Sequence, residues 1–310
     1  MLFGSAFVAL SGSLMRAPLG AQTSSIVIPL SADHGSGGEP RLGLDVTVGS
    51  TTKRVLFDTG STGLRMLAKE LPDDAYKRTG RAAKYEFGFG VEVRGEEATA
   101  TIGIGTAHAK NVPIQIVDEF GCGPEIRGDC PAQTLGMETF SGYAGIFGAY
   151  IRPPLLSGCC DSPFFNLDGK IGHRFIVHAN FDGPTVTLNP DAATVRTFSI
   201  VDFEAFGAPR GCIRVYESAH ETCGPVIFDT GTPPLLITTT GTVPPQPWTH
   251  ATLRIGTWTH DFKIGPLSRG GVPLSVHRSD VVRIVVGLMA MQEFDVYYDL
   301  DRRQVGVVTR

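Results

Sequence analysis

The strongest constraint on the fold is a segment that occurs twice, once in each half of the 310-residue chain. Residues 55–61 read VLFDTGS, and residues 226–232 read VIFDTGT. Average residue usage predicts a given tripeptide roughly 0.1 times in a chain of this length, so chance does not explain two copies of Asp-Thr-Gly after matching apolar runs. The repeat predicts two related halves, each with one carboxylate on a tight turn after a buried strand.

The repeat continues beyond these turns. At equal offsets after them lie apolar pairs, which are Leu64 and Met66 in the first half and Leu235 and Ile237 in the second. Each half later supplies two apolar residues followed by Gly, over residues 146–148 and 285–287. The two halves are therefore expected to share a structure rather than a short motif alone.

These motifs resemble those of the pepsin-like aspartic proteases, which are related to the retropepsins. In that family each lobe carries Asp-Thr-Gly-Ser/Thr and a later hydrophobic-hydrophobic-Gly segment beside the active-site loop. The C-terminal residues 285–310 are also similar to the ending of that family. The resemblance covers about residues 26–310, mainly at the motifs, and is closer to divergent bacterial members than to digestive pepsins. It implies an all-β, bilobal, pepsin-like acid protease fold with two related β-barrel-like lobes and the active site in the cleft between them.

On this basis the chain is expected to have three parts. Residues 1–24 are a candidate signal peptide or disordered leader, residues 25–170 form an N-terminal lobe, and residues 171–310 form a C-terminal lobe. The 38 Gly and 21 Pro, with many Val, Ile and Thr, suit short strands separated by turns. Strands are expected over residues 25–30, which pair at the lobe junction, and over 42–48, 53–58, 112–117, 173–180 and 185–188. The best short helix candidate is residues 68–78.

The resemblance implies that Asp58 and Asp229 are the catalytic residues. Two carboxylates a few ångströms apart cannot both be ionised easily, so they share one proton. One then takes a proton from water as general base, while the other donates to the carbonyl oxygen of a peptide bond. The sequence does not assign which aspartate is protonated.

Neighbouring residues fit the same scheme. The threonines of the two turns are expected to bond across to the opposite turn, the glycines to leave room for backbone N–H groups, and the hydroxyls to bond an outer carboxylate oxygen. These supporting residues are Thr59, Gly60 and Ser61 in the first turn and Thr230, Gly231 and Thr232 in the second.

The sequence departs from the family at the hairpin flap that covers the site. The expected flap and substrate-binding residues are Tyr85, Phe87, Gly88, Phe89 and Gly90, within a hairpin over residues 85–103. Phe87 stands where the family has Tyr, and Arg65 stands where the family has the Trp that bonds this Tyr. Tyr85 either supplies a hydroxyl from a shifted position or only packs, and packing is the preferred interpretation. Flap closure is therefore expected to rest on packing.

The chain has six cysteines, which allow 15 disulfide connectivities. Many pepsin-like proteins have a short disulfide loop where Cys212 and Cys223 stand, and Cys122 and Cys130 are expected to close a similar loop. For the adjacent Cys159 and Cys160, a vicinal bond and other pairings both stay open. The cysteine spacings match no common zinc pattern, so neither a metal nor another cofactor is expected.

Composition limits the classes of binding partner that the chain is expected to have. Charged residues make up 19% of the chain and the net charge is −4, which favours neither nucleic acid nor an anionic membrane as a partner. No stretch reaches the ~18 apolar residues of a membrane span. Residues 2–15 are apolar and small, which is typical of an export leader, and oxidised cysteines also go with export. A secreted or periplasmic monomer acting on a peptide or protein substrate is expected.

Two functions remain. The first is an aspartic endopeptidase acting through a water activated between Asp58 and Asp229. The alternative is a catalytically inactive pepsin-like binding or inhibitory protein, in which the altered flap accompanies loss of catalysis. The presence of both acids favours the protease, because a binding protein has no need of two intact catalytic turns.

Overall fold

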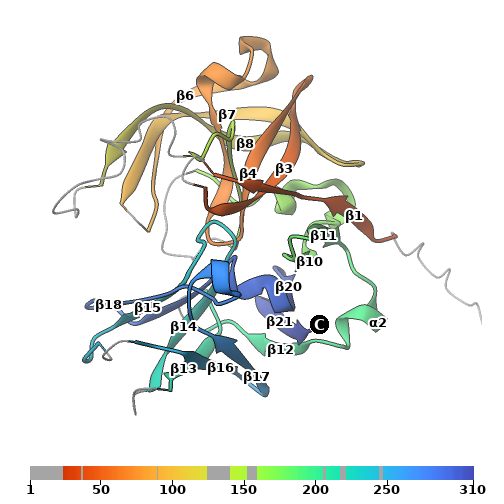
Figure 1. The fold of residues 1–310 in the computed structure, drawn as a ribbon. Helices are drawn as coiled ribbons and strands as arrows, with labels where there is room; N and C mark the ends of the chain where they lie inside the picture. The colour runs from red at the N-terminus through yellow and green to blue at the C-terminus, as the bar shows by residue number, and fades with distance from the viewer. Residues whose placement is uncertain are drawn as a thin grey trace, which may run out of the picture.

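The computed structural model describes residues 24–35, 38–88, 90–123, 140–151, 159–204, 207–216, 221–243 and 247–310. These residues are organised in three sheets (Figure 1). The strands are β1 (Ile26–Pro29), β2 (Ser31–His34), β3 (Pro40–Val48), β4 (Thr51–Asp58), β5 (Thr62–Leu67), β6 (Lys77–Glu86), β7 (Val91–Ile104), β8 (Ala107–Cys122), β9 (Gly145–Ala149), β10 (Arg174–His178), β11 (Thr185–Leu188), β12 (Ser199–Asp202), β13 (Arg210–Val215), β14 (Glu221–Asp229), β15 (Leu235–Thr239), β16 (His250–Ile255), β17 (Trp258–Lys263), β18 (Leu274–Arg278), β19 (Arg283–Gly287), β20 (Phe294–Asp299) and β21 (Gln304–Thr309).

Helical structure in the described residues is short. It consists of α2 (Ala192–Val195) and the 3-10 turns η1 (Ala68–Glu70), η2 (Asp73–Ala75), η4 (Pro163–Asn166), η5 (Asp168–Lys170), η6 (Leu267–Arg269) and η7 (Ala290–Glu293). The expected helix over residues 68–78 is therefore wrong. Pro72 lies between η1 and η2 in an extended conformation, and β6 already begins at Lys77. Proline lacks the N–H that a continuous helix needs.

The sheets of the two halves share a central arrangement of five strands, β3-β4-β9-β5-β8 in the first and β13-β14-β19-β15-β18 in the second. The eight-stranded sheet of the first half has the order β2-β3-β4-β9-β5-β8-β7-β6, and the seven-stranded sheet of the second has the order β17-β16-β13-β14-β19-β15-β18. In both, the strand that carries the aspartate pairs in parallel with the strand that ends in the apolar-apolar-Gly motif. Asp58 thus lies opposite Gly148, and Asp229 lies opposite Gly287. The all-β structure with two related halves is confirmed.

A third sheet joins strands from distant parts of the sequence. Its order is β1-β11-β10-β20-β21-β12, and Ile26 of β1 lies opposite Leu188 of β11. In Figure 1, red β1 therefore lies beside green β11. The first described strand thus pairs with strands of the second half, as expected for residues 25–30.

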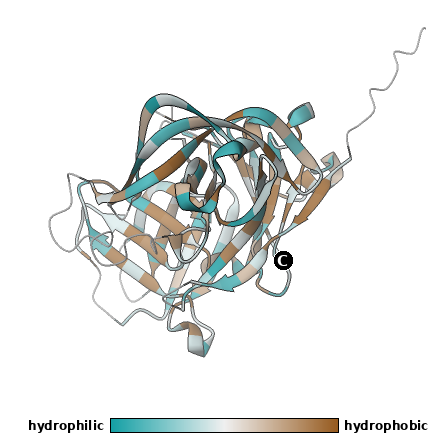
Figure 2. Ribbon diagram, turned by 90° about the horizontal axis from the view of Figure 1, so that it is seen from above, coloured by the Kyte–Doolittle hydropathy of each residue, from teal (hydrophilic) through white to brown (hydrophobic). Residues whose placement is uncertain are grey.

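The core is built from the inward faces of all three sheets. Hydrophobic and hydrophilic segments alternate along the strands in Figure 2, as the two-residue period of a strand requires. An aromatic series connects the halves. Ring centroids lie 6.1 Å apart for Phe57 and Phe147, 4.9 Å for Phe147 and Phe164, 4.8 Å for Phe164 and Phe175, and 4.7 Å for Phe175 and Tyr298. These packed rings hold the strand of the first aspartate against the third sheet.

The hairpin expected over residues 85–103 is formed by other residues than the sequence indicated. Lys77–Glu86 pairs with Val91–Thr99, whereas residues 99–103 continue the same long strand β7. The expectation of a hairpin with its turn at the glycines was right, but its first strand begins eight residues earlier than Tyr85. The sequence prediction missed this strand because Lys77–Ala82 is exposed and lacks apolar alternation.

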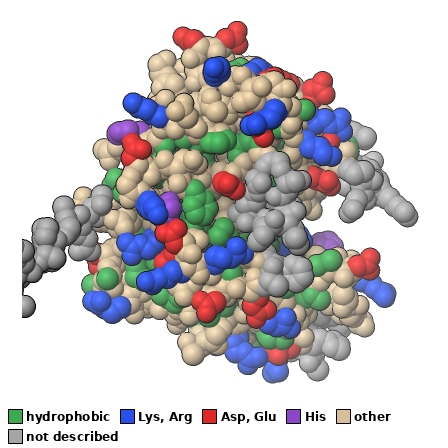
Figure 3. Space-filling model, turned by 180° about the vertical axis from the view of Figure 1, so that it is seen from behind, with side chains coloured by type: hydrophobic (Ala, Val, Ile, Leu, Met, Phe, Trp, Pro, Cys, Tyr) green, Lys and Arg blue, Asp and Glu red, His purple; other side chains and the backbone are tan. Residues whose placement is uncertain are grey.

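The outer surface carries both signs of charge. On the face shown in Figure 3, Lys and Arg side chains are interspersed with Asp and Glu side chains. Among the described residues, no helix has the length and apolar character needed to cross a bilayer.

Candidate active site

The two Asp-Thr-Gly turns are bonded directly to each other. The Thr59 amide donates to Thr230 Oγ1 at 3.0 Å, and the Thr230 amide donates to Thr59 Oγ1 at 3.0 Å. Each threonine hydroxyl then donates to the carbonyl before the opposite aspartate, with Thr59 bonding Phe228 and Thr230 bonding Phe57, both at 2.7 Å. Both threonines are fully buried, so these reciprocal bonds fix the separation of the turns.

Each aspartate is held by its own turn in the same way. The Gly60 amide donates to Asp58 Oδ1 at 2.7 Å, and Ser61 Oγ donates to Oδ2 at 2.6 Å. In the second half, Asp229 Oδ1 accepts from the Gly231 amide at 2.8 Å and Oδ2 accepts from Thr232 Oγ1 at 2.7 Å. Backbone and hydroxyl donors of its own turn thus bond both oxygens of each carboxylate.

The glycines allow the two aspartates to meet. A Cβ on Gly60 would lie 2.5 Å from the carboxylate oxygens of Asp229, and a Cβ on Gly231 would lie 2.7 Å from Asp58 Oδ1. Real Cβ atoms do not approach so closely, so each glycine is required by the carboxylate of the opposite half. Each carboxylate thus lies against the glycine of the opposite turn, which places the two aspartates beside each other.

Burial and the neighbouring Asp58 raise the pKa of Asp229 to about 8, against the opposing hydrogen bond from Thr232. Asp58 is buried, whereas Asp229 keeps part of its surface accessible to solvent. Two carboxyl groups in this setting retain one proton over a wide pH range, because ionising both places like charges in a poorly solvated site. Such a pair can offer one carboxylate as a base and one protonated carboxyl group as an acid.

A second layer supports the turns. A Cβ on Gly148 would lie 2.5 Å from Thr62 backbone carbon, and one on Gly287 would lie 2.5 Å from the Thr232 carbonyl oxygen. The Tyr298 hydroxyl donates to the Phe228 carbonyl at 3.3 Å, and burial raises the pKa of this hydroxyl well above its usual value. Tyr298 thus remains a neutral donor behind the second turn.

The hairpin β6–β7 turns at Phe87 and Gly90. The Phe87 amide donates to Val91 O at 2.9 Å, and the Gly90 amide donates to Phe87 O at 2.7 Å. Gly88 is exposed at this turn, and Phe89 lies outside the described residues. Phe87 is buried, with its ring centroid 6.3 Å from that of Phe140. Phe87 therefore packs inward within the first half.

Tyr85 contacts β5, the strand that follows the first turn. The Arg65 guanidinium carbon lies 3.5 Å from the centroid of the Tyr85 ring. Burial raises the pKa of Tyr85, Arg65 opposes this, and the charges of Asp58 and Asp229 also act on it. Of the two expected interpretations of Tyr85, ring packing is present, and its partner is Arg65.

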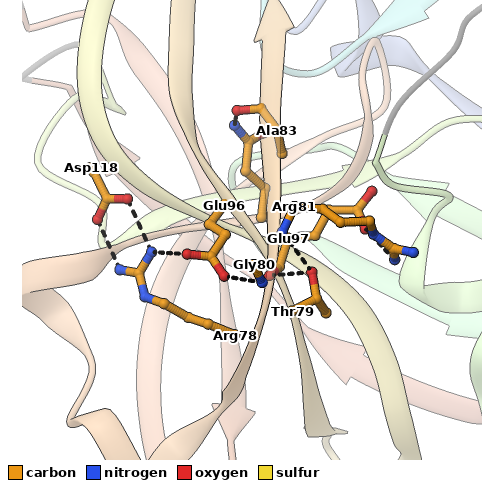
Figure 4. Close-up of polar contacts among 9 residues, drawn as sticks. Arg78, Thr79, Gly80, Arg81, Ala83, Glu96, Glu97 and Asp118 are labelled. Carbon is orange, nitrogen blue, oxygen red and sulfur yellow. Dashed lines mark hydrogen bonds and ion pairs between the residues drawn. The ribbon is translucent and has the colours of Figure 1, made fainter.

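The other end of the hairpin is held by charged side chains. Figure 4 shows Arg78 between Asp118 and Glu96. Arg78 Nη2 lies 2.9 Å from Asp118 Oδ1, and Nη1 lies 3.5 Å from Glu96 Oε2. The Gly80 amide bonds Glu96, which accommodates the irregular register between Arg78 and Ala82. These exposed pairs fix the base of the hairpin rather than its turn.

Two pairs of cysteines are joined among the described residues. Cys212 and Cys223 lie opposite each other on β13 and β14 and form the expected disulfide, with an S–S distance of 2.03 Å. Cys159 and Cys160 are bonded to each other. Glu221 lies beside the sulfurs of Cys212 and Cys223, but these sulfurs are already bonded and offer no thiolate to a metal. The expected Cys122–Cys130 pair involves Cys130, which lies outside the described residues.

A cavity of about 550 Å³ lies away from the two turns, against the third sheet. His178, Thr187 and Asp295 are among its lining residues, and His178 Nδ1 lies 2.8 Å from Asp295 Oδ1. No residue of either Asp-Thr-Gly turn lines it. The candidate active site is therefore defined by the geometry of its carboxylates.

Comparisons with known proteins agree with this arrangement at the level of the fold. A model of a protein family of unknown function, DUF3443, matches residues 44–159. The solved structures that match include the aspartic proteinase from Irpex lacteus, which is 18% identical, with a TM-score of 0.59 over 92% of this chain and 97% of that chain. A search of curated proteins found no match. The chain has a pepsin-like bilobal fold, as the sequence predicted.

The structure adds functional candidates that the sequence analysis did not select. Gln115 is buried beneath the hairpin, and Tyr298 is buried behind the second turn. Arg41 is largely buried, with Nη2 2.9 Å from Glu39 Oε1. Burial lowers the pKa of Arg41, while Glu39, Asp229 and Asp58 oppose this decrease. A single polar residue inside the apolar run of residues 112–117 was the available signal for Gln115, but it does not identify the partners.

Proposed function

We propose that this protein is an aspartic endopeptidase, a divergent bacterial-type member of the pepsin-like proteases, with Asp58 and Asp229 as its catalytic residues. The observation that carries the proposal is the reciprocal bonding of Thr59 and Thr230, which holds the two carboxyl groups beside each other. Such a pair matches the requirements of metal-free peptide hydrolysis, which needs a base for water and an acid for the carbonyl oxygen.

In the resting enzyme the two aspartates share one proton, and the proposed steps begin with this proton on Asp229, whose pKa is raised by burial and by Asp58. Asp58 then accepts a proton from water, whose oxygen bonds the carbonyl carbon of the substrate. Asp229 donates its proton to the carbonyl oxygen, giving a neutral tetrahedral diol. When the diol collapses, the C–N bond breaks and the nitrogen leaves with the proton held by Asp58. One hydroxyl group of the diol gives its proton back to Asp229 as the new carboxyl group forms, so the two aspartates again share one proton.

The surrounding residues supply orientation. Gly60, Ser61, Gly231 and Thr232 direct the carboxylates, and the hairpin that carries Tyr85 and Phe87 is the proposed flap. Preorganised donors of this kind avoid the reorganisation that water would need during the reaction. Substrates are peptides or proteins, and the protein acts as a monomer without a cofactor.

Further proposals concern organisation and location. We propose lobes over residues 25–170 and 171–310, with β1 crossing to the sheet of the second lobe. The disulfide between Cys212 and Cys223 supports export to the periplasm or the medium. N-terminal sequencing of the exported protein tests whether residues 1–24 are a cleaved leader.

The test of the function is incubation of purified protein with a peptide library from pH 2 to pH 9, with mass spectrometry of the products. Cleavage at internal bonds is expected, with activity falling as the pH rises towards 8 and the pair loses its proton. A peptide inhibitor with a hydroxyl group in place of the scissile carbonyl should block it, because it mimics the tetrahedral state. Tight inhibitor binding without cleavage would instead identify a non-catalytic binding protein.

A further inference from the structure

We propose that Tyr85 and Arg65 form a contact that positions the hairpin β6–β7 on the first catalytic turn and thereby supports turnover. This inference rests on the proposed function for its effect on catalysis. Its structural part, that the pair holds the hairpin, stands on the geometry alone. The Tyr85–Arg65 pair consists of positioning residues and includes no group that reacts with the substrate.

Arg65 is a buried cation in an otherwise apolar strand. All six residues of β5 are buried, and Arg65 is fully buried. Its Nη1 donates to the carbonyl oxygen of Thr62 and, at 3.4 Å, to that of Gly63. Burying a charge is costly unless polar contacts compensate it, and an apolar side chain would fill the same space without this cost. The cation is therefore placed where it contacts the backbone that follows the catalytic turn.

Tyr85 connects this cation to the hairpin. Its ring lies on the Arg65 guanidinium at 3.5 Å, within the range of a cation–π contact. Arg65 in turn bonds the Thr62 carbonyl. One side chain on β6 thus contacts the strand that directly follows the Asp58 turn, through the residue that bonds the first carbonyl of that strand.

Gln115 holds the hairpin above the same place. Gln115 of β8 lies opposite Arg65 of β5 and is fully buried. Its amide donates to Ala83 O on β6 at 3.1 Å and to Val93 O on β7 at 3.3 Å. Both strands of the hairpin are therefore fixed to the sheet immediately before Tyr85, and Tyr85 is the contact that extends this support towards the turn.

Phe87 does not share this role. It belongs to an apolar cluster with Leu56, Val93 and Phe140, against which Tyr85 also packs. The ring centroids of Tyr85 and Phe87 lie 5.0 Å apart, so Phe87 packs beside Tyr85. The position that couples the hairpin to the catalytic turn is therefore Tyr85, two residues before the position that the family resemblance indicates.

The experiment combines hydrogen exchange with kinetics on the full chain. Tyr85→Leu and Arg65→Met should speed exchange of the Glu86, Phe87 and Val93 amides at least about tenfold, since local opening becomes easier. Both should lower kcat by about 10- to 100-fold with a smaller change in KM, because substrate remains bound but poorly aligned. Tyr85→Phe keeps the ring and should stay within about fivefold of the wild type.

Arg78→Met is the matched control. Arg78 lies over the Tyr76 ring at 5.7 Å, so this change removes a cation–π pair from the other end of the hairpin. It should leave kcat and the exchange of the three amides unchanged. The double variant of Arg65→Met and Tyr85→Leu should be no worse than the poorer single variant, because both changes break one contact.

The outcomes separate the two proposals. Unchanged hairpin exchange in Tyr85→Leu overturns the positioning role, as does full additivity in the double variant. If the wild type cleaves no peptide, the proposed function fails, while the exchange measurement still decides the role of the pair. If Arg65→Met does not fold, Tyr85→Leu against Tyr85→Phe decides alone, because Tyr85 is only half-buried.

Discussion

The two halves of the molecule place equivalent aspartates on equivalent strands but differ one layer away. In the first half, Arg65 lies opposite Gln115, whereas the corresponding position in the second half pairs Leu236 with Ser275. The bonds that hold the carboxylates are nearly the same in both halves. What the chemistry requires is therefore duplicated, whereas the polar residues that support the hairpin occur in the half that carries it.

A second difference concerns the link between the strand that leads into each aspartate and the strand paired with it. In the first half, Thr47 and Thr52 lie opposite each other and their hydroxyls are 2.9 Å apart. The second half has the disulfide between Cys212 and Cys223 on its matching strand pair. The same strand geometry thus accepts a weak exposed hydrogen bond in one half and a covalent bond in the other. The second half is expected to depend more on its cross-link.

The largest expected effect tests whether the two halves contribute equally to catalysis. Asp58→Asn and Asp229→Asn should each lower kcat by more than about 1,000-fold, because each removes either the base or the acid. Circular dichroism should show an intact fold in both variants. Asp45→Asn is the control, since this exposed carboxylate pairs only with Arg54 among the described residues. Turnover within tenfold of the wild type in either catalytic variant would contradict the mechanism.

The next effect concerns the two cross-strand links, the Cys212–Cys223 disulfide and the Thr47–Thr52 hydrogen bond. Replacing both Cys212 and Cys223 by Ser should lower the free energy of unfolding by about 3 kcal/mol, because the closed loop no longer restricts the unfolded chain. Replacing Thr47 and Thr52 by Ala should cost less than about 1 kcal/mol, because their bond is exposed. Urea unfolding under non-reducing conditions measures both. Equal losses would mean that the cross-link is not what distinguishes the halves.

The threonine bonds test the symmetry of the site itself. Thr59→Val and Thr230→Val each remove a buried hydroxyl that accepts from the opposite amide and donates to a carbonyl. Each should lower the free energy of unfolding by about 2 kcal/mol, since an amide is left buried without a partner. The two losses should agree closely. A large difference between the two losses would contradict this symmetry, because one threonine would then contribute more than the other to joining the turns.

The smallest effect concerns the proton that the pair retains. Because the pKa of Asp229 is raised to about 8 in the folded protein, its contribution to stability is complete below its unfolded value near 3.8 and is lost as the pH rises to 8. Asp229→Asn should remove this dependence and stabilise the protein at pH 8 relative to pH 3 by more than about 1.4 kcal/mol, the equivalent of one pKa unit. Urea unfolding at both pH values measures it, and Asp45→Asn should leave the dependence unchanged. Parallel pH profiles for the wild type and Asp229→Asn would contradict the assignment.

Much of the fold was predictable from local patterns. The strands before both aspartates, the turns and the apolar-apolar-Gly segments were found where expected, because each is specified by residues adjacent in the sequence. The first strand of the hairpin was missed, because Lys77–Ala82 is exposed and its position depends on Glu96 and Asp118 from other strands. The expected helix failed at Pro72, where β6 follows too soon for a helix to form.

Residues adjacent in the sequence specify that each Asp-Thr-Gly turn ends a buried strand, because glycine, threonine and a preceding apolar run impose this locally. Packing between distant strands places Arg65 beneath Tyr85 and places Phe87 in an apolar cluster with Leu56 and Phe140. A strand pattern shows which residues share a face, but the partner across that face comes from another strand. Packing and the need to compensate a buried charge determine which strand provides that partner.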